Sequence, residues 1–131
     1  MVSGELLLAE DRVSLYDQLG GQRGIAVVVD DFYARMTSDD LLGPWFANAD
    51  HSGIRFHLRA YLAVALGGPE EYSGRSMRRA HGGLKITGAA FDTVLVRLAD
   101  SLDAASVDAA ILAEVVAVVA TLRPVVVQVP R

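Results

Sequence analysis

The sequence predicts an all-α domain, and three observations lead to this prediction. Apolar residues recur at helical spacing in several stretches, glycine pairs separate these stretches, and residues that cap helices precede many of them. At 131 residues, the chain is long enough for one domain with a single core. Residues 12–131 are expected to form this domain, after an N-terminal extension over residues 1–11.

The first two helices are predicted on either side of a glycine pair. Ser14 and Asp17 resemble a capping box with Asp in place of Glu, so a short helix is expected to begin there and to stop at Gly20-Gly21. Residues 22–36 are predicted as a second helix, because their apolar spacing outweighs the β-branched run at residues 27–29. Its apolar face comprises Ile25, Val28, Val29, Phe32, Tyr33 and Met36.

A turn is expected from Ser38 to Pro44, and the next helix follows it. Ser52 is expected to cap this helix, which extends to Leu66 and stops at the following glycine pair. Its single apolar stripe comprises Ile54, Leu58, Tyr61, Leu62 and Ala65.

The remaining elements follow a loop at residues 70–74. A short helix is expected to carry Met77 and His81 and to end at Gly82-Gly83. Thr87 caps a long helix, and Ser106 begins the last helix, which Pro124 weakens. The long helix places on one face Phe91, Val94, Leu95 and Leu98.

Composition excludes several classes of protein. A net charge of −4 argues against a nucleic-acid binder with a basic face, and the absence of cysteine excludes disulfides, zinc–thiolate sites and iron–sulfur clusters. The apolar run at residues 109–129 is interrupted by Glu114, Arg123 and Pro124, so a buried helix is expected rather than an integral membrane segment. A cytoplasmic protein is therefore expected.

His81 is one of only three histidines, so few side chains could hold a metal or a haem through nitrogen. It lies in a predicted helix, four residues after Met77. An imidazole in this setting suits a haem iron, although a histidine near a helix C-terminus could equally interact with the helix dipole.

Six short motifs in order strengthen the haem interpretation. Together they resemble the group I truncated haemoglobins over roughly residues 12–122. These motifs are LYDQLGG at residues 15–21, DFY at 31–33, WF at 45–46, ALGGP at 65–69, YSG at 72–74 and MRRAH at 77–81. The resemblance implies a two-over-two α-helical sandwich around haem b.

The resemblance implies that His81 is the proximal iron ligand and that Phe46 packs on the porphyrin. Other residues expected in the pocket wall could equally be core that only neighbours the haem; these are Phe32, Met77, Ile86, Phe91, Val94 and Leu98. Candidates for pairing with the haem propionates are Arg55, Arg78, Arg79 and Lys85, although each could also be solvated surface charge.

Tyr33 matches the family's distal tyrosine, whose O–H could stabilise a bound gas ligand. The alternative is a buried tyrosine bonded to a backbone carbonyl. Ile54 and Leu58 occupy positions where many relatives have glutamine, so no amide from this helix is expected to assist the Tyr33 hydroxyl.

His57 lies three residues beyond Ile54 on the same helix. In some relatives, a histidine at the matching position is a sixth iron ligand, so His57 is a candidate second metal ligand. The alternative is a propionate contact or simple solvent exposure. His51 is expected to precede the helix as a surface residue.

The resemblance implies a haem-binding globin that binds O₂, NO and CO, and therefore O₂ storage or nitric oxide dioxygenase activity supported by an unidentified reductase. A haem-based gas or redox sensor, or an electron-transfer protein with bis-histidyl iron, is the alternative. A haem-free helical interaction module is a third interpretation. A monomer or weak dimer is expected.

Overall fold

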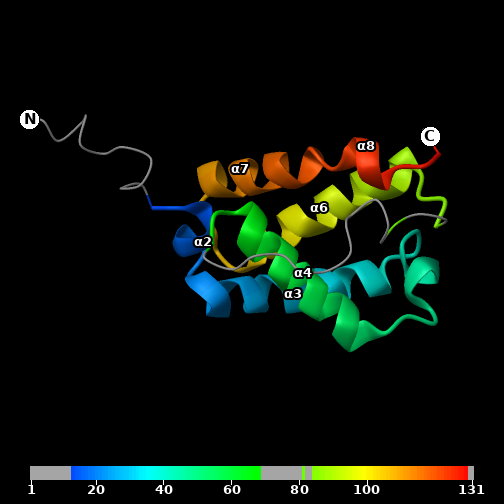
Figure 1. Cartoon of the computed structure of the whole chain (residues 1–131), viewed down its shortest axis with the longest axis horizontal. Helices are drawn as coiled ribbons and strands as arrows, with labels where there is room; N and C mark the ends of the chain where they lie inside the picture. Colours follow the sequence, from blue (N-terminus) through cyan, green and yellow to red (C-terminus); the bar gives the residue numbers. More distant parts are fainter. Residues whose placement is uncertain (1–12, 69–80, 82–83, 130–131) are drawn as a thin grey trace, which may run out of the picture.

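The computed structural model describes residues 13–68, 81 and 84–129, and every named element within them is a helix (Figure 1). One isolated parallel bridge joins Thr87 to Val129 in this part of the chain. The all-α prediction is therefore confirmed. The expected N-terminal extension lies almost entirely outside the described residues, so its boundary stays a prediction.

The helices α2 (Leu15–Gln18) and α3 (Gly21–Ser38) form as expected. The Ser14 hydroxyl accepts a hydrogen bond from the Asp17 N–H at 3.0 Å, which confirms the predicted cap. Gly20 separates the two helices with φ of 100°, a left-handed conformation that side chains disfavour. Every residue predicted for the apolar face of α3 is buried: Ile25, Val28, Val29, Phe32, Tyr33 and Met36.

The chain between α3 and α4 differs from the prediction. Gly43-Pro44 opens a 3₁₀ helix, η2 (Gly43–Phe46), instead of ending a turn, because proline is well suited to the first positions of a helix. Helix α4 (His51–Ala65) is capped by Asp50, whose carboxylate accepts from the Gly53 N–H at 3.1 Å. The prediction of Ser52 as the cap is wrong, because the acidic residue two positions earlier takes this role.

The C-terminal half contains α6 (Gly88–Ala104), α7 (Ala109–Ala120) and α8 (Arg123–Val126). Thr87 caps α6 as predicted, accepting from the Ala90 N–H at 2.9 Å. Ser106 does not begin α7, because its φ of 63° is left-handed; Asp108 is the cap instead. Pro124 lies in the first turn of α8, after the backbone has left α7.

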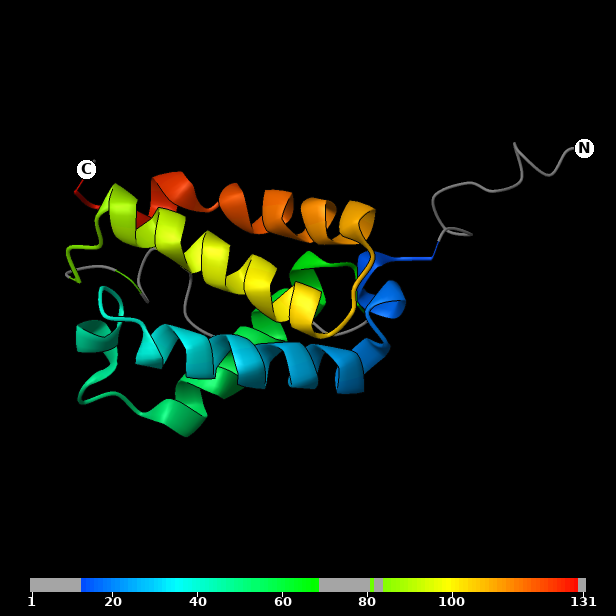
Figure 2. The same ribbon diagram turned by 180° about the vertical axis from the view of Figure 1, so that it is seen from behind.

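The long helices form two layers. Helix α4 crosses α3 in one layer, and α6 runs antiparallel to α7 in the other; α3 and α6 join the layers (Figures 1 and 2). The core lies between them, where the side chains of Val29, Leu98 and Leu102 are fully buried. The predicted two-over-two arrangement is thus the observed one.

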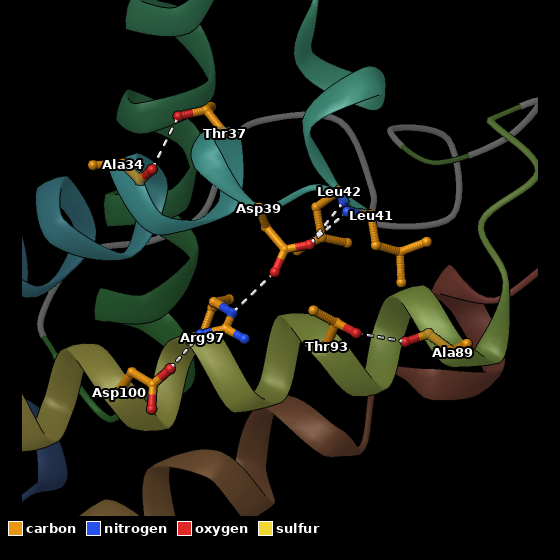
Figure 3. A network of polar contacts seen from close by, with 9 residues as sticks. All are labelled: Ala34, Thr37, Asp39, Leu41, Leu42, Ala89, Thr93, Arg97 and Asp100. Carbon is orange, nitrogen blue, oxygen red and sulfur yellow. Dashed lines mark hydrogen bonds and ion pairs between the residues drawn. The ribbon is translucent and has the colours of Figure 1, made fainter.

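A polar network fastens the end of α3 to α6 (Figure 3). One oxygen of Asp39 accepts from the Leu41 and Leu42 N–H groups at 2.8 and 3.0 Å, and the other accepts from Arg97 Nε at 3.1 Å. Arg97 also donates to Asp100 at 2.7 Å. The turn after α3 is therefore held against the middle of α6.

The apolar C-terminal stretch is less buried than predicted. Within α7, only Val115 and Val119 are buried, because the helix packs through one face on α6. The window Ala109–Val126 has a mean hydropathy of 2.0 and only 17% of it is buried, so its length and composition alone would allow it to cross a membrane. In the structure this window is not one continuous helix, since α7 ends at Ala120 and α8 starts at Arg123.

Candidate functional site

Tyr33 lies at the centre of a cluster of three rings between α3, η2 and α4. Its side chain is 4% exposed, and its hydroxyl lies 2.5 Å from Nδ1 of His51. The Phe46 ring meets the Tyr33 ring edge-on, with centroids 5.4 Å apart and an interplanar angle of 82°. The alternative of a tyrosine bonded to a backbone carbonyl does not hold for the contact observed, because the partner is a side chain.

Two charged groups flank the Tyr33 ring. Burial raises the pKa of Tyr33; the nearby Arg55 guanidinium, 5.7 Å from the ring centroid, lowers it, and the Asp50 carboxylate raises it. The net direction of the pKa shift is upward. The phenol therefore keeps its proton at neutral pH and can act as a donor.

His51 is a candidate site residue that could not be recognised from the sequence pattern. It is exposed, as expected of a surface residue, but it is the first residue of α4 and not part of the preceding loop. Asp50, a residue type strongly preferred at the N-cap, was the signal that could have located the helix start. With Asp50 as the cap, His51 is placed in the first turn, beside Tyr33.

The side of α4 next to this cluster is apolar. Ile54, Leu58 and Tyr61 are half-buried and pack against the core. Burial raises the pKa of the Tyr61 hydroxyl. Positions 54 and 58 carry no amide side chain. The described hydrogen-bond partner of the Tyr33 hydroxyl is His51, at the start of α4.

His57 is exposed. Its ring contacts that of Phe56, with centroids 5.6 Å apart, and Phe56 is itself 60% exposed. The structure therefore places His57 outside the core. Its role as an iron ligand stays a prediction.

His81 is half-buried, in helical conformation, and its carbonyl accepts from the Leu84 N–H at 3.2 Å. The Trp45 indole donates to the Leu84 carbonyl at 2.8 Å. Since Trp45 belongs to η2, this bond connects the segment after His81 to the element that carries Phe46. The two sides of the candidate site are thereby joined.

Ile86 is held by the C-terminal segment. Its N–H donates to the Gln128 side-chain oxygen at 3.1 Å, and its carbonyl accepts from the Gln128 and Val129 N–H groups at 2.9 and 3.0 Å. Ile86 is half-buried against the core. The chain after α8 therefore fixes the position of Ile86, a predicted wall residue.

The other predicted wall residues divide by burial. Phe32, Phe91 and Leu98 are buried at 4%, 2% and 0% exposure, whereas Phe46 and Val94 are half-buried. Met77 lies outside the described residues. The first three are therefore core in the structure, and the half-buried pair offers apolar surface.

Among the propionate candidates, Arg55 approaches Asp30 at 3.9 Å and Lys85 is exposed. Arg78 and Arg79 lie outside the described residues. Arg55 thus has an acidic neighbour on α3, and its partly exposed guanidinium contributes little to stability through that pair.

These side chains suit a flat apolar group such as haem. Half-buried apolar residues from four parts of the chain pack against one core, and the polar side chains of the candidate site include the half-buried imidazole of His81 and the buried phenol of Tyr33. Such surface is costly to leave in water and would be covered by a porphyrin. The half-buried apolar set comprises Phe46, Ile54, Leu58, Tyr61, Ile86 and Val94. This apolar surface, with the His81 imidazole as a possible nitrogen ligand, therefore fits haem.

Comparisons with known proteins agree on one family. Residues 14–128 match the model of the family described as bacterial-like globin. The chain is 36% identical over 111 residues to the group 1 truncated haemoglobin GlbN of Mycolicibacterium paratuberculosis, covering 85% of this chain and 82% of that protein. It is 38% identical to GlbN of Synechocystis, over 80% of this chain and 88% of the relative.

Solved structures show the same fold. The Fe(III) form of the truncated haemoglobin from Tetrahymena pyriformis superposes with a TM-score of 0.85 at 28% identity, covering 88% of this chain and 98% of the other. The 2/2 haemoglobin from Synechococcus, in the cyanomet state with covalently attached haem, has a TM-score of 0.80 at 29% identity, over 86% and 95% of the two chains.

Proposed function

This chain belongs to the bacterial-like globins, with group 1 truncated haemoglobins among its relatives, and from this premise we propose that it binds haem b, binds O₂ reversibly and oxidises NO to nitrate. Haem and gas binding follow from the family. The identity of the haem as haem b and the reaction with NO go beyond what the family implies.

One observation supports the proposal most. The Tyr33 side chain is 4% exposed and its hydroxyl contacts His51, so a phenol donor is held in a buried position on α3. His81 takes the proximal position by family resemblance, through a neutral imidazole nitrogen. The proposed apolar wall consists of residues that are half-buried against the core: Phe46, Ile54, Leu58, Ile86 and Val94.

A haem held by His81 would supply the chemistry of the proposed reaction: O₂, NO and one electron from ferrous iron would give nitrate and leave the iron ferric. A reductase must return the electron before the next turnover. The protein's own contribution is to hold the group through His81, to exclude water with apolar side chains and to place a donor at Tyr33.

Haem binding is tested by titrating the purified protein with haemin and recording the absorption spectrum. One haem per chain is expected for the wild type, and loss of the specific spectrum is expected for His81→Ala. A protein that takes up no haem would overturn the proposal and favour a haem-free helical module.

The reaction with NO is tested by rapid mixing of the O₂-loaded protein with NO and by measuring nitrate. Stoichiometric nitrate and ferric protein are expected within the mixing experiment. Reversible O₂ binding without nitrate formation would reduce the proposal to O₂ binding or storage.

The alternative function, a gas or redox sensor or an electron-transfer protein, requires His57 at the iron. His57 is exposed and its described ring contact is with Phe56, so no described contact favours this alternative. A cytoplasmic location and a monomer or weak dimer remain part of the proposal; fractionation and sedimentation of the purified protein test them.

A further inference from the structure

We propose that His51 is a positioning residue for Tyr33: as an acceptor at Nδ1 it holds the phenol proton, and so it controls whether that proton reaches a ligand bound at the haem. This inference rests on the proposed function. It gives His51, at the start of α4, the role of hydrogen-bond partner to Tyr33 that a glutamine at position 54 or 58 would have.

The contact geometry supports this assignment. The Tyr33 oxygen and His51 Nδ1 are 2.5 Å apart, and the two rings meet at 66° with centroids 5.6 Å apart. A phenol carries one proton, and a neutral imidazole has one nitrogen that accepts. Tyr33 therefore donates either to His51 or to a bound ligand, but not fully to both.

The fold fixes this pair at both ends. Tyr33 is buried on α3 and rests against Phe46, while His51 is anchored by the Asp50 cap at the start of α4. His51 also reaches solvent. A proton can thus exchange with water at His51 without disturbing the core.

The charge state of His51 sets the direction of the hydrogen bond. Histidine is the side chain that changes charge between about pH 5 and 8. Protonated His51 has no acceptor, so it donates to the Tyr33 oxygen and leaves the phenol proton free for a bound ligand. Neutral His51 accepts the proton and competes with the ligand.

The charged groups that face the pair are few among the described residues. Asp50, the cap of α4, and Arg55 on α4 act on the pKa of Tyr33 with opposite sign, and Asp30 on α3 is 3.9 Å from Arg55. Carboxylates and guanidinium keep their charges between pH 5 and 8. His51 differs from these groups because its imidazole can accept a hydrogen bond when neutral and can only donate when protonated.

The first experiment measures O₂ dissociation from the haem-loaded protein between pH 5 and 9, together with the C–O stretching frequency of the carbonmonoxy form. In the wild type we expect release to be about fivefold slower at the acidic end, the ratio given by one net hydrogen bond. The C–O frequency should follow the same curve, because it senses a donor at the ligand.

Two variants separate the partners. His51→Ala removes the acceptor, so we expect slow release at every pH; Tyr33→Phe removes the donor, so we expect fast release at every pH. The control Ser52→Ala changes an exposed neighbour in the same turn and should keep the wild-type curve. A pH step that persists in His51→Ala, or a wild type without one, would overturn the inference.

A second readout does not depend on gas release. With ¹⁵N-labelled histidine in the carbonmonoxy protein, the signals that disappear in His51→Ala identify His51. At pH 8 we expect Nε2 to carry the proton and Nδ1 to accept, and we expect the Nδ1 signal to move in Tyr33→Phe. A Nδ1 signal unchanged by Tyr33→Phe would contradict the contact, whereas failure to bind haem or O₂ would count against the proposed function itself.

Discussion

At the scale of single residues, the site depends on which imidazole meets which partner. Three histidines lie in three settings: His51 touches Tyr33, His57 is exposed beside Phe56, and His81 is half-buried. The same side chain can be an acceptor, a surface group or an iron ligand, because its neighbours set the role of each nitrogen.

We predict that His57→Ala leaves the ferric absorption spectrum unchanged. The reason is that His57 is exposed and its described ring contact is with another exposed side chain. The spectrum of the purified ferric protein checks this, with His81→Ala as the variant expected to change it. A low-spin wild type that becomes high-spin in His57→Ala would instead make His57 the sixth ligand.

At the scale of elements, the end of α2 and the start of α3 lie so close together that a side chain at Gly24 has no room. A Cβ at Gly24 would lie 1.6 Å from the Leu19 carbonyl oxygen and 2.6 Å from its carbonyl carbon, and both atoms are backbone. Helices α2 and α3 can therefore meet at this angle only with glycine at position 24.

We predict that Gly24→Ala lowers the free energy of unfolding by about 1 to 3 kcal/mol, the usual range for forced overpacking. Chemical denaturation followed by circular dichroism measures it. Val27→Ala serves as the control, because Val27 lies on the same helix and is 62% exposed. Equal stability of the two variants would mean that α2 moves away without cost.

The turn after α3 makes stability depend on pH. The Leu42 N–H, the Leu41 N–H and Arg97 hold the pKa of Asp39 below its usual value, against an opposing effect of burial. A carboxylate with a lowered pKa stabilises the fold above the pKa of the unfolded chain, about 3.9, and this contribution is lost as the pH falls through the lower, folded value.

We therefore predict that Asp39→Asn lowers the melting temperature at pH 7 and that the difference from the wild type shrinks as the pH is lowered below about 4. Thermal unfolding at a series of pH values measures it. Asp40→Asn, at the exposed neighbouring position, is the control. A difference that stays constant with pH would show that Asp39 acts through its hydrogen-bond geometry and not through its charge.

At the scale of the whole molecule, haem binding and folding are expected to be coupled. The half-buried apolar side chains proposed for the haem pocket come from η2, α4, α6 and the segment before α6, so a group that covers them joins elements distant in sequence. A ligand that binds only the folded state stabilises it according to its concentration.

We predict that haem raises the melting temperature. The free energy of unfolding should increase by about 4 kcal/mol when the free haem concentration is a thousand times its dissociation constant. Calorimetry of the haem-free and haem-loaded protein checks this. His81→Ala should lose most of the gain. A haem-free protein as stable as the loaded one would argue that these helices need no prosthetic group to complete their core.

Much of the architecture could be predicted from sequence, because it depends on local patterns. The apolar spacing of α3 predicted every buried residue of its core face, and Ser14 and Thr87 cap the helices expected of them. Predictions were wrong where two capping residues competed: Asp50 displaced Ser52, and Asp108 displaced Ser106. Neighbouring residues with similar capping ability are distinguished by the path of the backbone and not by their chemistry.

By itself, the sequence determined the helical class, the two long apolar faces of α3 and α6, and the positions of Tyr33 and His81 within the family's motifs. These follow from periodicity and from residue identity. Only the tertiary structure decided that His51 meets Tyr33, since the two lie eighteen positions apart and on different helices. It also decided that α7 buries only Val115 and Val119 fully, because the number of packing partners around a helix is a property of the assembled layers.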